Sequence, residues 1–484
     1  MPFSVKNDKM NQIQTLFKNV SWVTASQVVT NICAFLWTIL IARYLGVTDY
    51  GTLSFVISFT VLIGMGTDIG VSTFTTRELA QDKAKTKKFI DNLILFKIIL
   101  SVILCVFTVL IVYLLGYSNL VVELTLIMFI EASFVTMFNF VNGVFQAHEN
   151  LRPSAIGVMV YSISLLVLVF IVTFLDLGIL AIAISYAVGY LLGLLYVSYN
   201  LIKSFGFPKF EIDLTFWKNT AIKSIPFGLT IFFYMIYFSI DVVMISWLAG
   251  DYATGIYNSA YKVISVFTAF YVIYQFVIFP LMSKLYSEDT DLLKISFEQS
   301  FKYSLLILLP IIIGVYFYSP YLITLIYSAE FALASVPMQI LIWTVVFLFI
   351  NGVATSLLNS IGKEFSVTKI YVIAAIFNIL LNYFLIPKYT YIGASVATVL
   401  SEILILALMM YSISKTKYKP DYTLLNTVIR LLISGLILAI ALYFINVSLW
   451  VAIPIGLVVY ILALFITGSI DDMDKYIFKE LLGK

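Results

Sequence analysis

The chain has little charge: Lys, Arg, Asp and Glu make up 11% of its 484 residues. A soluble domain has about 25% charged and 45–50% apolar residues. Here 62% are apolar, and the mean hydropathy is +1.03. This composition excludes a soluble globular protein, a disordered chain and a disulfide scaffold. It is typical of a chain that crosses a membrane many times, because lipid is then the solvent for its apolar surface.

Histidine and cysteine are almost absent. A single histidine, His148, excludes a His-rich metal site. Cys33 and Cys105 lie in separate apolar stretches, and we interpret both as core residues without a disulfide or redox role. The net charge of +3 is too small to argue for nucleic acid. The chain has no GxxxxGK[ST] phosphate loop and no HExxH, so we expect no built-in ATPase, no metal and no cofactor.

Long apolar segments dominate what remains. The first seventeen residues are mostly polar, and the apolar run that follows is too long for a cleavable signal peptide, so we expect it to stay as a membrane helix. A bilayer-spanning helix needs about 20 apolar residues. The sequence predicts an all-α polytopic membrane protein with fourteen spans, at about 19–42, 51–75, 90–116, 120–146, 154–175, 178–202, 223–248, 253–282, 301–318, 333–360, 367–386, 392–413, 423–445 and 449–468. Pro310 and Pro320 interrupt the ninth, and Tyr321–Tyr327 is predicted as a re-entrant piece or an external turn.

Basic residues predict the orientation, because they favour cytoplasmic segments. With the N-terminus inside, the inner segments hold 24 Lys and Arg, and the outer segments hold two, Arg43 and Lys388. Both termini are therefore expected in the cytoplasm of a cell-membrane protein.

Two stretches repeat. ARYLGVTDYGTLSF (42–55) is similar to ISWLAGDYATGIYNSA (245–260), and 174–201 is similar to 388–414. Spans 1–6 and 7–12 are thus predicted to be two parallel copies of a six-helix lobe that enclose a central cavity, an architecture common among transporters. The predicted domains are a cytoplasmic N-terminus 1–18, a first lobe 19–202, a linker 203–222, a second lobe 223–414, spans 13 and 14 over 415–468 and a cytoplasmic C-terminus 469–484.

Polar stripes mark the predicted cavity. Span 1 carries Thr24, Gln27, Asn31 and Thr38 at helical spacing, and span 7 carries Thr230, Tyr234, Tyr237 and Asp241. In span 4, Glu131 begins a stripe with Asn139, Asn142 and Gln146. These stripes indicate either walls of a wet cleft or hydrogen bonds inside a packed bundle.

Charges at membrane depth are expensive and are expected to face a cavity or a partner. The ionisable residues within the spans are Asp68, Lys97, Glu123, Glu131, Asp241, Lys262, Glu402 and Arg430. Lys97 is predicted either to reach Asp68 or to extend to the cytoplasmic interface. Lys262 is predicted either to meet an anionic substrate or to pair with Asp241 at matching depth. Glu402 is a proton or cation site or a packing partner, Glu123 is expected to be wetted, and Arg430 is expected to pack in the bundle or contact lipid headgroups.

ARYLGVTDYGTLSF, followed by GTDIGVSTFTTRELAQDK (66–83), resembles the polysaccharide-biosynthesis membrane proteins. These are the Wzx-type oligosaccharide-lipid flippases of the multidrug/oligosaccharidyl-lipid/polysaccharide exporter superfamily. The resemblance implies a flippase that moves a polyprenyl-pyrophosphate-linked oligosaccharide from the inner to the outer leaflet by alternating access. Its expected partners are the lipid-linked oligosaccharide, membrane lipid, and glycosyltransferases or a polymerase of the same pathway. By position, Arg43, Lys97 and Lys262 are the nearest candidates for the pyrophosphate. The predicted cavity residues are Gln27, Asn31, Arg43, Asp68, Lys97, Glu131, Tyr234, Tyr237, Asp241, Lys262 and Glu402.

Two alternatives remain at this point. A multidrug or organic-cation antiporter on the same fold requires an acidic cavity dominated by a carboxylate such as Asp68 or Asp241. A glycan polymerase or ligase usually needs a large outer loop for its catalytic site, and the sequence has none. The protein is therefore not expected to be an enzyme.

Overall fold

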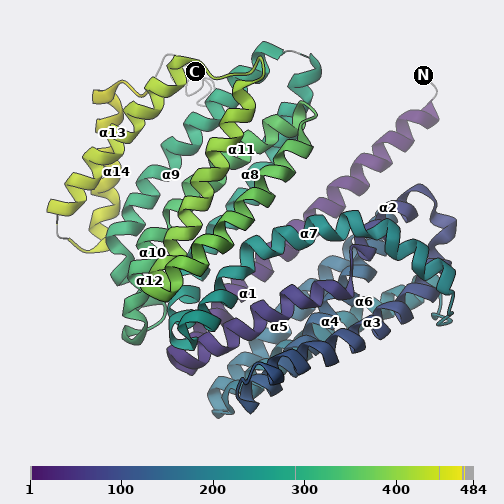
Figure 1. The fold of residues 1–484 in the computed structure, drawn as a ribbon. Coiled ribbons are helices and arrows are strands. Elements are labelled where there is room, and N and C mark those ends of the chain that lie inside the picture. The colour runs from purple at the N-terminus through teal and green to yellow at the C-terminus, as the bar shows by residue number, and fades with distance from the viewer. Residues whose placement is uncertain (1–2, 289, 446, 471–473, 475–484) are drawn as a thin grey trace. The chain divides into compact units, whose positions relative to one another are not determined.

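The computed structural model describes residues 3–288, 290–445, 447–470 and Asp474. It does not describe the side chains of residues 3–17, 230, 231, 233, 234, 237, 238 and 290. Within the described chain every regular element is helical (Figure 1). The α-helices are α1 (Phe3–Gly64), α2 (Val71–Gln81), α3 (Thr86–Leu114), α4 (Asn119–Ala147), α5 (Arg152–Leu175), α6 (Gly178–Phe205), α7 (Leu214–Ala249), α8 (Asp251–Glu288), α9 (Thr290–Ile326), α10 (Ser335–Leu341), α11 (Trp343–Ser360), α12 (Glu364–Ser414), α13 (Tyr422–Phe444) and α14 (Leu449–Thr467). Three short 3₁₀ turns are η1 (Met65–Thr67), η2 (Lys83–Lys85) and η3 (Ala329–Ala334).

The prediction of an all-α polytopic membrane protein is confirmed. Eleven helical stretches of the described chain are long and apolar enough to cross a membrane. Two of these stretches each cover two predicted spans, because α1 bends at Gly46 and α12 bends at Thr390. The eleven stretches overlap thirteen of the predicted spans, and span 7 falls within α7. Each of the fourteen predicted segments is therefore largely helical.

Three local predictions are wrong in detail. The second span is not one helix, because α1 ends at Gly64 and the chain continues through η1 into the short α2. The tenth span is divided among η3, α10 and α11. Tyr321–Tyr327 is neither re-entrant nor an external turn: α9 continues through Pro310 and Pro320 to Ile326. Neighbouring helices and local adjustments let membrane helices keep internal prolines.

The chain divides into two units, residues 1–246 with 250–255 and residues 247–249 with 256–484. Most of α7 groups with the first unit, although the repeat pairs this helix with span 1. The repeat describes duplicated sequence, whereas this grouping reflects packing. The predicted lobe boundaries, and a cavity enclosed by two lobes, therefore stay predictions.

Small residues allow the helices of the first unit to approach closely. A Cβ on Gly157 of α5 would lie 2.4 Å from Val197 Cγ1 of α6, and a Cβ on Gly193 of α6 would lie 2.9 Å from the Gly157 carbonyl oxygen. Lipid tails are as apolar as leucine, so membrane helices associate through such close packing rather than through the hydrophobic effect. The glycines therefore hold α5 and α6 together.

The repeated junction motif forms a reciprocal crossing. Within the first unit, a Cβ on Gly51 would lie 1.9 Å from the Asp251 carbonyl oxygen, and a Cβ on Gly255 would lie 2.0 Å from the Val47 carbonyl oxygen. Counted from the junction glycines Gly46 and Gly250, which both have positive φ, residues 47 and 51 match residues 251 and 255, so each copy contributes one glycine and one carbonyl. The Thr52 hydroxyl also donates to Asp251 Oδ2 at 2.8 Å.

In the second unit, α13 and α14 lie beside α9 (Figure 1). The Tyr460 hydroxyl donates to the Leu306 carbonyl at 3.1 Å, and Lys302 pairs with Asp474 in a buried contact of 2.6 Å. The two helices outside the repeat are thus attached to the duplicated part through α9.

Candidate functional site

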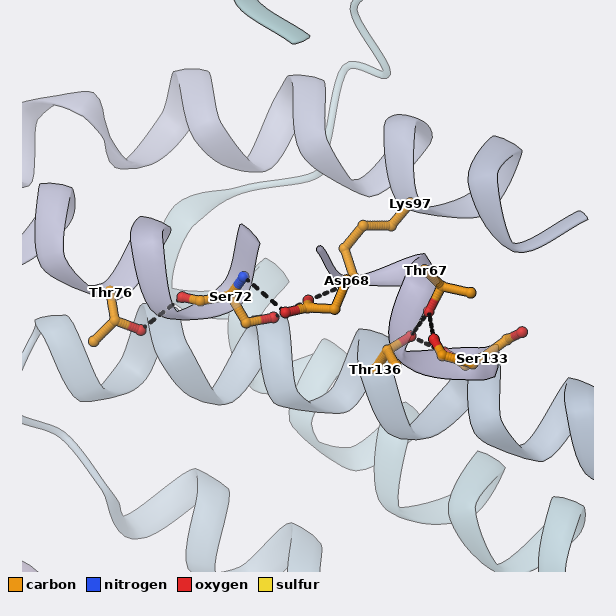
Figure 2. A network of polar contacts seen from close by, with 8 residues as sticks. Thr67, Asp68, Ser72, Thr76, Lys97, Ser133 and Thr136 are labelled. Atoms are coloured by element: carbon orange, nitrogen blue, oxygen red, sulfur yellow. Dashed lines mark hydrogen bonds and ion pairs between the residues drawn. The ribbon is translucent and has the colours of Figure 1, made fainter. Parts of the chain in front are cut away.

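The break between α1 and α2 positions an ion pair within the second predicted span (Figure 2). Ile69 and Gly70 have φ values of 45° and 78°, which end one helix and start the next. Asp68 accepts hydrogen bonds from the Ser72 hydroxyl and from the Ser72 backbone N–H, the latter at 3.3 Å. The carboxylate therefore caps the N-terminus of α2, where unpaired N–H groups favour a negative charge.

Lys97 reaches Asp68 from α3 (Figure 2). Its side chain is fully buried, whereas that of Asp68 is 17% exposed. Of the two predicted alternatives for Lys97, the structure shows pairing with Asp68 rather than extension to the interface. Lys97 is not among the residues that line the cavity described next, and Asp68 compensates its charge.

A cavity of about 1380 Å³ lies within the first unit. Its walls come from the end of α1, η1, α2, α4, one residue of α6, and α7. Most of the lining is apolar, and a polar track runs along α2 and α4.

The polar track contains the stripe predicted on span 4. Glu131, Asn139, Asn142 and Gln146 all line the cavity, as does Asp68. Glu131 and Gln146 are fifteen positions apart, so the track extends roughly 22 Å along α4 at 1.5 Å per residue. The four residues of the span 4 stripe therefore all border this cavity.

The sequence did not single out Arg77, Thr136 or Tyr190 as cavity residues, yet all three line it. In the sequence, Arg77 is one of the 24 basic residues of the predicted inner segments. Its guanidinium carbon lies 6.0 Å from the centre of the Phe227 ring on α7, and the side chain is exposed. The signal available in the sequence was helical spacing: Thr73 and Arg77 stand one turn apart in the motif that follows Asp68.

Glu131 lies at the other end of the track and is 7% exposed. Its titratable neighbours are Tyr161, Tyr186 and Tyr190. Within the described residues, we find no hydrogen bond or ion pair to its carboxylate. The cavity thus has a guanidinium near one end and a buried carboxylate near the other.

The remaining predicted site residues that the structure describes do not line this cavity. On α1, Gln27 and Asn31 are exposed and hydrogen-bonded to each other at 3.4 Å, and Arg43 is exposed. Asp241 of α7 is buried. The side chains of Tyr234 and Tyr237 lie outside the described residues.

In the second unit, Lys262 is exposed. Asp241 and Lys262 belong to different units, so their pairing stays a prediction. Glu402 is buried and accepts a 2.8 Å hydrogen bond from the Asn351 side chain, which favours the packing role predicted for it. Arg430 donates to the Gly468 carbonyl at 2.8 Å and links α13 to the end of α14. Among the described residues no group of three His, Cys, Asp or Glu side chains is placed to hold a metal.

Comparison with known proteins assigns the class of this chain. The family model for polysaccharide biosynthesis proteins matches residues 16–286, and the MatE model matches residues 226–384. A solved structure of the lipid II flippase MurJ, in an inward closed conformation, has a TM-score of 0.76 at 16% identity and covers 96% of this chain and 99% of that one. These matches define a transporter of the multidrug/oligosaccharidyl-lipid/polysaccharide exporter superfamily.

The chain belongs to the polysaccharide biosynthesis protein family. Among its relatives, the capsular polysaccharide biosynthesis protein CapF of Staphylococcus aureus is 22% identical over 82% of this chain and 98% of its own length. A protein of Shigella dysenteriae named for O-antigen transport is 22% identical over 77% of this chain and 93% of its own length. The family resemblance seen in the junction motifs is therefore confirmed.

Proposed function

We propose that this transporter is a flippase for oligosaccharides linked to a polyprenyl phosphate or pyrophosphate, and that it moves them from the inner to the outer leaflet by alternating access. The observation that carries the proposal is the cavity of the first unit, in which a polar track runs along a mainly apolar wall. Sugars and phosphates cannot cross hydrocarbon alone, because each unsatisfied polar group costs several kcal/mol there. A polar track supplies the missing partners, and the lipid chain needs none.

Arg77 is our candidate for the phosphate contact. It is the basic residue among the described residues that line the cavity, and its guanidinium has no carboxylate partner in the described part of the chain. Arginine binds phosphate oxygens through paired N–H donors. Asn142 adds a buried side-chain oxygen that has no hydrogen-bond partner. This oxygen can accept a hydrogen bond from a sugar hydroxyl. Lys97, proposed from the sequence for this role, is already paired with Asp68.

The cytoplasmic orientation of both termini belongs to this proposal, and so does a cell-membrane location. Both rest on the distribution of basic residues, which places Arg77 near the cytoplasmic end of span 2. A substrate made in the cytoplasm would then meet Arg77 first. Glycosyltransferases or a polymerase of the same pathway are proposed partners on the same reasoning.

The test is a flipping assay with the full chain in proteoliposomes that contain a polyprenyl-pyrophosphate-linked oligosaccharide. Transfer between leaflets is read from the fraction of glycan open to an external glycosidase. We expect Arg77→Gln to slow transfer by at least about tenfold, since a hydrogen bond to a charged group contributes about 1.5–3 kcal/mol. Arg77→Lys should retain part of the rate.

The matched control is Arg152→Gln. Arg152 is an exposed arginine at the start of α5 that packs over Trp22 and does not line the cavity. Equal rates in Arg77→Gln and Arg152→Gln would remove Arg77 from the phosphate site. Transfer no faster than in protein-free vesicles would reject the flippase itself.

One observation favours a second candidate, an ion-coupled exporter of organic cations: the MatE model matches part of the chain, and the Glu131 carboxylate lines the cavity. The other lining carboxylate, Asp68, is compensated by Lys97, which weakens this candidate. Export of a fluorescent organic cation from cells that express the protein would support it, provided that Glu131→Gln abolishes the export.

A further inference from the structure

Glu131 is an acid that the proposed handling of sugar and phosphate does not use. It lies in the membrane-spanning part of α4, is 7% exposed and borders the cavity. A charge near the centre of a bilayer is costly, so such a residue usually faces a cavity or a partner. In the described chain no basic side chain forms an ion pair with this carboxylate, whereas Lys97 pairs with Asp68.

The surroundings of Glu131 contain groups that can respond to its charge. Its titratable neighbours are Tyr161 on α5 and Tyr186 and Tyr190 on α6. The rings of Tyr161 and Tyr190 stack with their centres 3.7 Å apart. The side chain of Tyr186 forms a hydrogen bond with Trp37 of α1. The other charged residues that line the same cavity are Asp68, which is paired with Lys97 of α3, and Arg77 of α2.

We propose that Glu131 is a proton-binding site whose occupancy is coupled to transport. When the cavity is wet, the carboxyl O–H bond breaks, the proton passes to cavity water, and the tyrosine hydroxyls donate hydrogen bonds to the carboxylate. Before the water leaves, the carboxylate takes a proton from a hydronium ion in the cavity water, which becomes neutral water, because a neutral acid is far cheaper to bury than a charge. Coupling to transport rests on the proposed flippase function, whereas proton binding itself does not.

A proton fits this site better than a metal cation. Hard cations such as Mg²⁺ and Ca²⁺ take six or more oxygen ligands, several of them carboxylates or carbonyls. Near Glu131 the described chain offers tyrosine hydroxyls, and it has no cluster of three acidic or other metal-binding side chains. A proton needs only the carboxylate.

The first experiment measures proton binding without any substrate. Infrared difference spectra of the purified full chain, recorded between high and low pH, should contain the carbonyl stretch of a protonated carboxylic acid. We expect Glu131→Gln to remove this band and Glu123→Gln to keep it, because Glu123 is an exposed glutamate on the same helix. If the Gln variant does not fold, Glu131→Asp replaces it in the experiment. The carbonyl band of this variant should lie at a changed frequency. An unchanged spectrum in both Glu131 variants would overturn the proposal.

The second experiment measures coupling. In the flipping assay, a pH gradient of one unit should change the wild-type rate by up to about tenfold, the ratio of proton concentrations, and should leave Glu131→Gln unaffected. The same response in both proteins would reject coupling through Glu131. If a sodium gradient at constant pH changed the wild-type flipping rate in the same way, the coupled ion would be a metal cation. That result would also overturn the proposal. Absence of flipping in the wild type would reject the proposed function and leave the infrared result to decide proton binding.

Discussion

At the scale of single residues, the Asp68–Lys97 pair shows how a membrane helix accommodates opposite charges. The lysine is fully buried, whereas the aspartate borders a cavity and also bonds Ser72. The two charges therefore differ in how well they tolerate the loss of the other. Asp68 keeps polar neighbours and access to water, and Lys97 keeps neither.

This difference predicts unequal mutations. Asp68→Asn leaves Lys97 buried and unpaired, so we expect a loss of about 3–5 kcal/mol, the usual effect of breaking a buried pair. Lys97→Met should cost less than half as much, because Asp68 retains hydration and its Ser72 hydrogen bonds. The double variant should resemble Lys97→Met.

Thermal unfolding in detergent, followed by tryptophan fluorescence, measures all three variants. Asp421→Asn is the control, since the Lys294–Asp421 pair is exposed, with Asp421 63% accessible. Equal losses in Asp68→Asn and Lys97→Met would contradict the proposed asymmetry.

His148 gives the protein one histidine-dependent pH response outside the membrane. It follows α4, its Nε2 lies 2.8 Å from the Thr86 hydroxyl, and partial burial, followed by the nearby Lys83 charge, lowers the pKa of its imidazole. The unfolded chain then binds a proton more readily than the folded chain. Stability should be complete above the ordinary histidine pKa of about 6.5 and should decrease as pH falls from there to the lowered folded value.

Unfolding midpoints between pH 8 and pH 5 check this response. His148→Gln should remove the part of the decrease that falls in this window. Because His148 is the only histidine in the chain, its titration can also be followed directly by NMR of the labelled residue. A folded pKa above 6.5 would reverse the expected sign.

At the scale of elements, glycines decide where helices meet. The crossing of Gly51 and Gly255 brings each residue against a backbone carbonyl, which cannot move aside as a flexible side chain can. Both glycines come from the duplicated junction, so the repeat preserves a contact as well as a pattern. Gly193 of α6 likewise lies against a backbone carbonyl, that of Gly157 on α5.

We therefore expect Gly51→Ala and Gly255→Ala each to destabilise the fold by several kcal/mol or to prevent folding, since the new methyl carbon would lie about 2 Å from a carbonyl oxygen. Gly314→Ala is the matched control, because this helical glycine on α9 has no atom within 4 Å of its added Cβ. It should be neutral or stabilising by up to about 1 kcal/mol. Yield of monodisperse protein and unfolding midpoint are the measurements. Normal folding of both alanine variants would show that the helices separate at no cost.

At the scale of the whole molecule, the distribution of charge along the chain predicts its orientation. Lys388 lies in a predicted outer segment, and Lys419 lies in a predicted inner segment between spans 12 and 13. Both side chains are exposed. These two positions, only 31 residues apart, are thus predicted to lie on opposite sides of the membrane.

In a background without Cys33 and Cys105, Lys388→Cys should react with an impermeant thiol reagent in intact cells. Lys419→Cys should react only after the membrane is permeabilised. The reverse pattern would invert the orientation and would place Arg77 at the outer end of the cavity, which contradicts the proposed route of the substrate.

Much of the fold could be predicted because hydropathy is read along the chain, one segment at a time. The fourteen segments, the duplicated junctions and the stripe on span 4 all follow from local composition and helical spacing. Breaks inside spans 2 and 10 could not be predicted, since they depend on which neighbours satisfy the freed backbone groups. The unbroken course of α9 through two prolines has the same cause.

The sequence by itself determined that this is a polytopic membrane protein with a repeated unit. It also determined that few ionisable residues lie within the spans, each of which is expected to face a cavity or a partner. Only the tertiary structure decided what each charge meets. It paired Lys97 with Asp68, placed Arg77 on a cavity and left Glu131 buried without a basic partner in the described chain. The physical reason is that membrane insertion depends on a residue and its own segment, whereas the state of a charge depends on the helices packed around it.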